Sequence, residues 1–166
     1  MEIKFFSNSF LDGLIRDSLS SVRQRKNFNI HDKYDDSCQR LFNVIGLESY
    51  IPPHRHSLDP KQECLIAISG LFALLVFNDK GEVSKINKFG SDLYRKLDIN
   101  CGVGVEIPSN VWHTVIALSE SAVLFEIKEG PFDPLLAKEI APWALNEGDP
   151  NALDYLRFLR ARVSTD

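Results

Sequence analysis

The sequence predicts a mainly β protein, an antiparallel sandwich or small barrel, with a helical segment before and after the barrel. The first observation is a series of about eight short apolar runs between residues 39 and 129, spaced by turn-like segments. The second is an amphipathic pattern before this region, and the third is a helical pattern after it. Because no long helical pattern separates the runs, antiparallel pairing is favoured over alternating βαβ units.

The N-terminal pattern covers residues 7–24, in which apolar side chains recur at a helical spacing. Ser7 and Ser9 can act as N-caps. Asp12 falls in the first turn, where a negative charge suits the helix dipole. These features predict an amphipathic helix that packs one face on the barrel.

The polar segment that follows, residues 25–37, has too few apolar residues to form core and is predicted to be a loop or an edge. If it is extended, Asn27, Asn29 and His31 alternate and share one face, near the barrel mouth. The basic run at residues 23–26, Arg-Gln-Arg-Lys, is interpreted as a solvated turn after the helix and not as a phosphate site.

The runs predicted as strands are residues 40–46, 49–56, 63–69, 71–78, 83–89, 102–108, 111–118 and 121–130. The segment 78–82, Asn-Asp-Lys-Gly-Glu, lies between two of these runs and is a good hairpin signal. Asp149 and Pro150 are predicted to begin the C-terminal helix as its N-cap and first helical residue. Leu153, Leu156 and Leu159 then lie roughly along one side of this helix. We predict a single domain over 1–166, divided into a helix and polar segment (1–38), a barrel (39–129) and a helical tail (130–166).

Composition is that of an ordinary soluble protein. The chain has 166 residues, a net charge of -4 and a pI near 5.6, which argues against nucleic acid as the main partner because phosphate binding favours a basic surface. No apolar run approaches the roughly 18 residues of a membrane span, and the N-terminus lacks a signal-peptide pattern. The three cysteines, Cys38, Cys64 and Cys101, are far apart and fit a reducing compartment. We therefore predict a cytoplasmic protein without nucleic-acid or membrane partners.

Two of the four histidines stand one residue apart, at His54 and His56, directly after two prolines. In an extended segment, side chains at i and i+2 point to the same face, so these imidazoles share a side. Glu63 opens the next apolar run, and His113 follows about fifty residues later in another predicted strand. A small barrel can bring such inward-facing groups together at its mouth. Three nitrogen donors and one oxygen donor suit a divalent first-row metal with one or two positions left open.

The first of these segments resembles the first motif of the cupin superfamily, in which two histidines and a glutamate precede a glycine. His54, His56, Glu63 and Gly70 are similar to that motif. The spacer between His56 and Glu63 is six residues, longer than is usual in the motif. The resemblance implies a cupin-type barrel, a double-stranded β-helix or jelly roll, between the two helical segments.

The second segment is similar to the second cupin motif through Gly102, Pro108 and His113. Asn110 stands where the motif has its internal glycine, and asparagine tolerates positive φ better than most residues. Ala117 stands in place of the final asparagine of the motif. The metal ligands implied by the resemblance are His54, His56, Glu63 and His113.

The resemblance extends beyond the motifs to the WbuC family of cupin-fold metalloproteins, over roughly residues 20–160. The segments that carry it are QRLFNVI, SYIPPHRH, WH, FEIKEGPF and APWALNEG. This family is encoded in some bacteria near O-antigen genes, which implies a small polar molecule, for example a sugar derivative, in polysaccharide- or O-antigen-related metabolism. Cupins commonly pair through their sheets, so the resemblance also implies a homodimer.

Outside the ligand set, the candidates for proton transfer beside the metal are His31, Tyr50 and Glu126. His31 can instead be a surface or supporting histidine, and Tyr50 can simply pack. Arg40 and Lys128 are candidate anion contacts for a substrate. Glu126 and Lys128 alternate with apolar residues, so they either face water, which a half-buried strand favours, or line a polar barrel interior.

Three functions stay open at this point. The preferred one is a metal-dependent enzyme of isomerase or dioxygenase type, in which one divalent ion (Fe, Zn, Mn or Ni) polarises a substrate oxygen or, as iron, binds dioxygen. The second is a non-catalytic module that binds a small ligand through its metal. The third is a structural barrel that the metal staples together. A coordination position open to a pocket favours the first function over the third.

Overall fold

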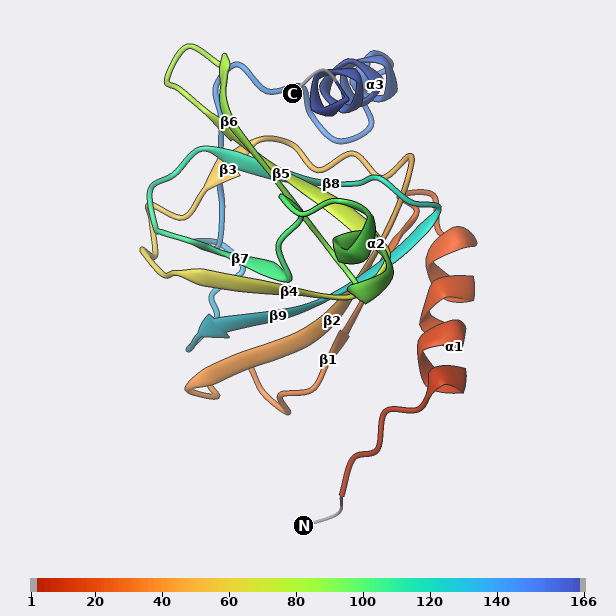
Figure 1. The fold of residues 1–166 in the computed structure, drawn as a ribbon. Helices are drawn as coiled ribbons and strands as arrows, with labels where there is room; N and C mark the ends of the chain where they lie inside the picture. The colour runs from red at the N-terminus through yellow and green to blue at the C-terminus, as the bar shows by residue number, and fades with distance from the viewer. Residues whose placement is uncertain (1–2, 165–166) are drawn as a thin grey trace.

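The computed structural model describes residues 3–164 and consists of two five-stranded antiparallel sheets packed face to face (Figure 1). Residues 1–2 and 165–166 of the predicted domain lie outside this described range. Sheet A has the order β1 (Arg25–Asn29), β2 (Cys38–Gly46), β9 (Ser121–Glu129), β4 (Glu63–Ser69) and β7 (Gly104–Ile107). Sheet B has the order β10 (Glu139–Ile140), β3 (His54–Arg55), β8 (His113–Ala117), β5 (Leu71–Phe77) and β6 (Val83–Gly90). Successive strands such as β4 and β5 lie in different sheets, which is the arrangement of a double-stranded β-helix, and the predicted fold class is confirmed.

The predicted apolar runs correspond to β2 and to β4 through β9, with ends shifted by up to two residues. The run 49–56 is the exception, since its strand is limited to His54–Arg55. Pro52 and Pro53 have no N–H to donate to a neighbouring strand, which keeps the preceding part out of the ladder. β1 and β10 were not predicted as strands, although β1 lies at the edge of sheet A, in the segment predicted to be loop or edge.

The hairpin between β5 and β6 is confirmed. The Asn78 N–H donates to the Glu82 carbonyl over 3.0 Å. Gly81 has a φ of 82°, which is the left-handed backbone that a glycine adopts without steric cost. The turn therefore closes at the position that the sequence indicates.

The helix α1 (Asn8–Leu19) begins as predicted, because the Ser7 hydroxyl accepts a hydrogen bond from the Phe10 N–H over 3.2 Å. The helix α3 (Ala152–Val163) begins two residues later than predicted. Asp149 instead closes a turn before it by accepting the Asn151 N–H over 2.8 Å. The short helix α2 (Asp92–Leu97) was not predicted.

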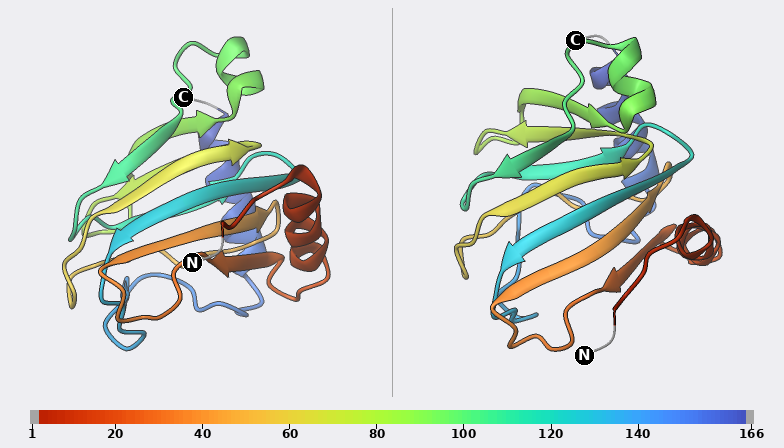
Figure 2. Two further views of the ribbon diagram at one scale, coloured as in Figure 1. Left: turned by 90° about the horizontal axis from the view of Figure 1, so that it is seen from below. Right: turned by 60° about the horizontal axis from the view of Figure 1, so that its bottom comes forward.

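The helices α1 and α3 cover the outer faces of the two sheets, with α1 beside sheet A and α3 over sheet B (Figures 1 and 2). One apolar cluster fills the space between the sheets and includes Leu65, Phe72 and Leu124. A second lies between sheet B and α3, and a third lies between sheet A and α1. Because β5 is covered on both faces, its sequence is a continuous apolar run and does not alternate. No helix among residues 3–164 is both long and apolar enough to cross a membrane.

Candidate metal centre

Three histidines meet inside the barrel, one on β3, one directly after β3 and one on the neighbouring strand β8 of sheet B. His54 on β3 is paired directly with His113 on β8, and their ring centroids are 4.5 Å apart. His56 lies two residues after His54, on the same side. All three side chains are buried, and one nitrogen from each lies within 4.8 Å of the other two. These three residues can therefore hold one metal ion.

Each of the three imidazoles is oriented by a backbone carbonyl. The Nδ1–H of His54 donates to Pro52 over 2.9 Å, and that of His113 donates to Val111 over 2.8 Å. The Nδ1 of His56 lies 2.5 Å from the Ala137 carbonyl oxygen and 2.9 Å from the Lys128 ammonium. A carbonyl partner at Nδ1 favours the tautomer whose lone pair is on Nε2, and such support is typical of metal-ligating histidines.

The Glu63 carboxylate faces two of these Nε2 atoms from sheet A. Its Oε2 lies 3.2 Å from the Nε2 of His56 and 3.7 Å from the Nε2 of His113. Two lone-pair-bearing atoms at such a distance repel each other unless a proton or a metal cation lies between them. Two ligand atoms about 2.1 Å from one ion are about 3.0–3.4 Å apart at right or tetrahedral angles. The donor set therefore fits a divalent metal, with Glu63 as the proposed fourth ligand.

A cationic side chain already compensates this negative charge. The Lys128 ammonium lies 3.2 Å from the His56 Nε2 and 3.5 Å from the Glu63 Oε1. Lys128 is directly opposite Glu63 in the β4–β9 pairing, and both side chains are buried. A metal and this ammonium would share the same partners, so their binding is expected to be coupled.

Burial and neighbouring charges set the protonation of the site. Burial, followed by the charges of Lys138 and His113, lowers the pKa of His54 well below its ordinary value, so this ring is a neutral ligand. Burial alone would raise the pKa of Glu63, but the His113 and His56 rings and the Lys128 charge lower it well below the usual range.

The Glu126 carboxyl behaves in the opposite way. Burial, followed by the negative charge of Glu63, raises the pKa of Glu126 to about 8. Two carboxyl groups with separated pKa values thus lie side by side, one ionised and one protonated at neutral pH. Such a pair is a common feature of sites that move protons.

The strand that carries two of the histidines is anchored by an ion pair at its other face. Arg55 points away from the metal centre and donates to Glu139 on β10 over 2.7 and 2.9 Å. Its guanidinium also lies 4.2 Å from the centroid of a Trp112 ring. Arg55 therefore holds β3 in place between His54 and His56.

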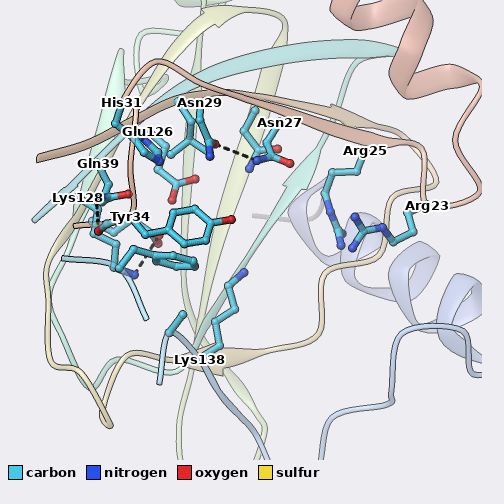
Figure 3. A pocket seen from close by; sticks show the side chains of 15 residues that line it. Arg23, Arg25, Asn27, Asn29, His31, Tyr34, Gln39, Glu126, Lys128 and Lys138 are labelled. Atoms are coloured by element: carbon cyan, nitrogen blue, oxygen red, sulfur yellow. Dashed lines mark hydrogen bonds and ion pairs between the residues drawn. The ribbon is translucent and has the colours of Figure 1, made fainter. Parts of the chain in front are cut away.

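A polar cavity of about 370 Å³ opens beside the metal centre (Figure 3). It shares Glu63, Glu126, Asn43 and Lys138 with a smaller pocket that reaches His54 and His113. The remaining lining residues are Arg23, Arg25, Asn27, Asn29, His31, Tyr34, Gln39, Leu41, Lys128, Phe132 and Ala137. The shared residues make the cavity the approach to the metal centre.

One wall of the cavity is the inner face of β1 and its flanks. Asn27, Asn29 and His31 alternate along the chain and line it together, as the sequence indicates for an extended segment (Figure 3). The Asn27 side chain donates to Asn29 over 3.1 Å. The interpretation of residues 23–26 as a solvated turn was wrong for Arg25, which begins β1 and pairs with Glu147 over 2.7 Å.

Two of the predicted site residues lie elsewhere. Arg40 is exposed and alternates with Gln39 and Leu41, which line the cavity, so its side chain points to the outer face of β2. Tyr50 is buried under α3, where its hydroxyl donates to the Leu145 carbonyl over 3.1 Å. The hypotheses that Arg40 contacts substrate and that Tyr50 transfers protons beside the metal are therefore corrected.

For Glu126 and Lys128, the solvent-facing orientation that alternation favours was wrong. Lys128 is buried and Glu126 half-buried, and both line the cavity. The reason is that α1 covers the outer face of sheet A, where Phe125 packs against its apolar cluster. The charged side chains therefore face the polar interior.

The turn before β8 confirms the expectation for Asn110. Its φ is 66°, the left-handed conformation that the glycine of the motif would adopt. Lys138 and Asn43, in contrast, were not predicted as site residues. Asn43 is a polar residue on the inner face of a mostly apolar strand, which is a weak signal, and no local pattern marks Lys138.

Comparison with solved structures shows where this fold occurs. A structural-genomics protein from Shewanella oneidensis is 12% identical, with a TM-score of 0.56 over 78% of this chain and 82% of that chain. An uncharacterised Klebsiella pneumoniae protein with a double-stranded β-helix domain is 13% identical, with a TM-score of 0.54 over 84% and 98%. A mutant of Bacillus subtilis oxalate decarboxylase is 16% identical, with a TM-score of 0.50 over 70% of this chain and 27% of that chain.

At these identities the likeness concerns the fold alone. The two sheets and these neighbours define the fold as a double-stranded β-helix, and a buried histidine triad that could hold a metal ion lies inside it. A family model described as "Domain of unknown function (DUF6016)" matches residues 6–89. The chain therefore belongs to this family. No curated protein gives a significant match.

Proposed function

We propose that this protein is a metal-dependent enzyme of isomerase or dioxygenase type that acts on a small polar molecule. The metal ligands are His54, His56, His113 and Glu63. The observation that carries the proposal is the buried triad of histidines, each with its Nδ1 beside a backbone carbonyl, with the Glu63 carboxylate next to two of the three rings. A cavity beside this set leaves room for a substrate.

The residues around the cavity have separable roles in this proposal. A bound divalent ion would supply Lewis-acid polarisation of a substrate oxygen. Glu126 is the candidate for proton transfer, because its carboxyl lines both the cavity and the smaller pocket that reaches the histidines. Lys128 balances the charge of Glu63 while the substrate binds or leaves.

Finer parts of the proposal depend on the sequence resemblance. A sugar-derived substrate in polysaccharide- or O-antigen-related metabolism follows from the WbuC-like segments. A homodimer is proposed because cupins commonly pair through their sheets. The free state of Cys38, Cys64 and Cys101 supports a cytoplasmic protein. The single domain over 1–166 is part of the same proposal.

The first test is the metal content of protein purified without added ions, measured by plasma mass spectrometry. We expect about one equivalent of a transition metal in the wild type, and loss of stoichiometric metal in His56→Ala. His31→Asn is the matched control, because it removes another buried histidine outside the triad. Full occupancy in His56→Ala would overturn the ligand assignment.

The second test separates an enzyme from a binding module or a structural staple. Wild type and His56→Ala are incubated with a metabolite extract, which is followed by untargeted mass spectrometry. Depletion of a compound by the wild type alone supports catalysis. A compound retained by the protein but unchanged supports the binding module. X-ray absorption that shows four protein ligands and no exchangeable position would instead support a structural metal.

A further inference from the structure

We propose that the cavity beside the metal centre binds a small carboxylate that also carries hydroxyl groups, with Lys138 contacting the carboxylate and His31 donating to a hydroxyl oxygen. This inference rests on the proposed function and names the ligand class of the same site. The carrying observations are polar atoms of the cavity that have no hydrogen-bond or ion-pair partner among residues 3–164, and each is complementary to one part of such a ligand.

His31 presents a donor to the cavity. The His31 Nδ1 lies 3.0 Å from both the backbone nitrogen and the carbonyl oxygen of Arg40. The Arg40 carbonyl is already satisfied by the Ile30 N–H over 2.8 Å. If Nδ1 carried the proton, the Arg40 N–H would lose its partner, so the proton lies on Nε2. His31 therefore has the opposite tautomer to the metal-site histidines.

This Nε2–H is buried and unpartnered. His31 is 7% exposed, and its Nε2 has no hydrogen-bond partner among the described residues. The residue lines the cavity, and an unpaired buried donor is costly to leave unsatisfied. A ligand oxygen in the cavity would satisfy it. As a donor, His31 positions a ligand and does not serve as the general base suggested by the sequence.

Asn43 presents an acceptor on the same cavity wall. Its Oδ1 is buried without a hydrogen-bond partner in the described part of the chain. Asn43 is paired with Asn27 across β1 and β2, and both line the cavity. An unpaired donor and an unpaired acceptor together match a hydroxylated ligand, because a hydroxyl group can both accept and donate.

Lys138 supplies the charge. Its side chain enters the cavity opposite the β1 wall (Figure 3). Among residues 3–164 no carboxylate lies within salt-bridge distance of it, and the carboxyl groups of Glu63 and Glu126 act on it only at longer range. Two neighbouring cations of the cavity are engaged, since Arg25 pairs with Glu147 over 2.7 Å and Lys128 lies 3.5 Å from Glu63. Lys138 is therefore available to bind an anion near the metal centre.

The remaining wall suits the carbon skeleton of such a ligand. Tyr34 and Phe132 line the cavity with ring centroids 5.1 Å apart in an edge-to-face arrangement. Aromatic faces beside polar groups are suited to the C–H surface of a hydroxylated chain. The volume of about 370 Å³ is in the usual range for small-molecule sites.

The test measures binding of three probes to the metal-containing protein by isothermal titration calorimetry. D-gluconate carries a carboxylate and hydroxyl groups, sorbitol carries the hydroxyl groups alone, and hexanoate carries the carboxylate alone. We expect gluconate to bind at least tenfold more tightly than either of the others. Equal affinity for gluconate and sorbitol, or for gluconate and hexanoate, would overturn the ligand class.

Two variants assign the roles of the residues. Lys138→Met should remove the preference for gluconate over sorbitol, whereas His31→Phe should remove the preference for gluconate over hexanoate. Lys85→Met, on an exposed position of β6, is the matched charge control and should change neither. His31→Gln should restore much of the preference, because glutamine keeps an amide donor. An unchanged preference in Lys138→Met overturns the carboxylate contact.

The outcome can be separated from that of the proposed function. The metal content of every sample is measured in parallel. Wild-type protein that purifies without metal contradicts the metal-dependent function. Wild-type protein that holds its metal but does not prefer gluconate contradicts the ligand class alone. Circular dichroism of each variant shows that an altered preference does not come from unfolding.

Discussion

The substitution Lys128→Met tests the coupling between the lysine and the metal. In the metal-free protein, Lys128 is the cation nearest to the buried Glu63, at 3.5 Å. At an effective dielectric constant near 20, a pair at this distance attracts with about 5 kcal/mol. Removing one partner of a buried ion pair typically costs about 3–5 kcal/mol. Methionine keeps most of the side-chain volume, so the loss reports charge more than packing.

We therefore expect the free energy of unfolding in a chelator to fall by about 3 kcal/mol. With saturating zinc the loss should be below about 1 kcal/mol, because a divalent ion at the histidines would neutralise Glu63 in place of the ammonium. By linkage, the difference of about 2 kcal/mol appears as roughly 30-fold tighter metal binding in the variant.

The assay is guanidinium denaturation at pH 7, followed by tryptophan fluorescence, in chelator and in zinc. Lys85→Met makes the same charge change on an exposed part of β6 and should alter stability by less than about 0.5 kcal/mol. Equal losses for Lys128→Met with and without zinc would refute the coupling. So would a loss below about 1 kcal/mol in chelator.

Three further predictions concern the supports of the site. The hydrogen bond with Arg55 lowers the pKa of Glu139, so the stability from this pair is present above about pH 4.5 and is lost as pH falls through the lowered pKa. Glu139→Gln should remove that part of the acid dependence, which is seen by comparing unfolding curves of both proteins from pH 6 to 3; parallel curves would contradict it. Asn110→Ala should cost about 1 kcal/mol because of the positive φ, while Asn110→Gly should cost little, as thermal unfolding can measure. Arg25→Met should cost about 1–2 kcal/mol by breaking the contact with Glu147, and Glu147→Gln should reproduce part of this loss in chemical denaturation.

Local patterns were sufficient for much of the fold. The strand-length apolar runs, the hairpin at residues 78–82 and the N-cap at Ser7 all depend on neighbours in the chain, and the structure confirms them. The positive φ of Asn110 is also a local property, and it was predicted from the type of residue in the motif. The start of α3 was misplaced by two residues, because Asp149 can serve equally well in a helix cap or in a turn.

The histidine triad could be predicted because its spacing reflects strand geometry. His54 and His56 share a face by the period of two, and His113 lies on the strand that pairs with His54. The face of a strand that points inward could not be predicted in the same way, because alternation defines two faces but does not show which of them another element covers. Packing of α1 on sheet A turned Lys128 and Glu126 inward and left Arg40 outside.

The sequence alone thus determined the class of fold and the residues that can hold a metal, since both depend on spacing along short segments. The tertiary structure decided the surroundings of the metal centre. Lys138 reaches the cavity because the segment after β9 folds back across the mouth, and the tautomer of His31 depends on a backbone N–H from a neighbouring strand. Contacts between distant segments depend on how the chain closes on itself, and no local pattern in the chain records them.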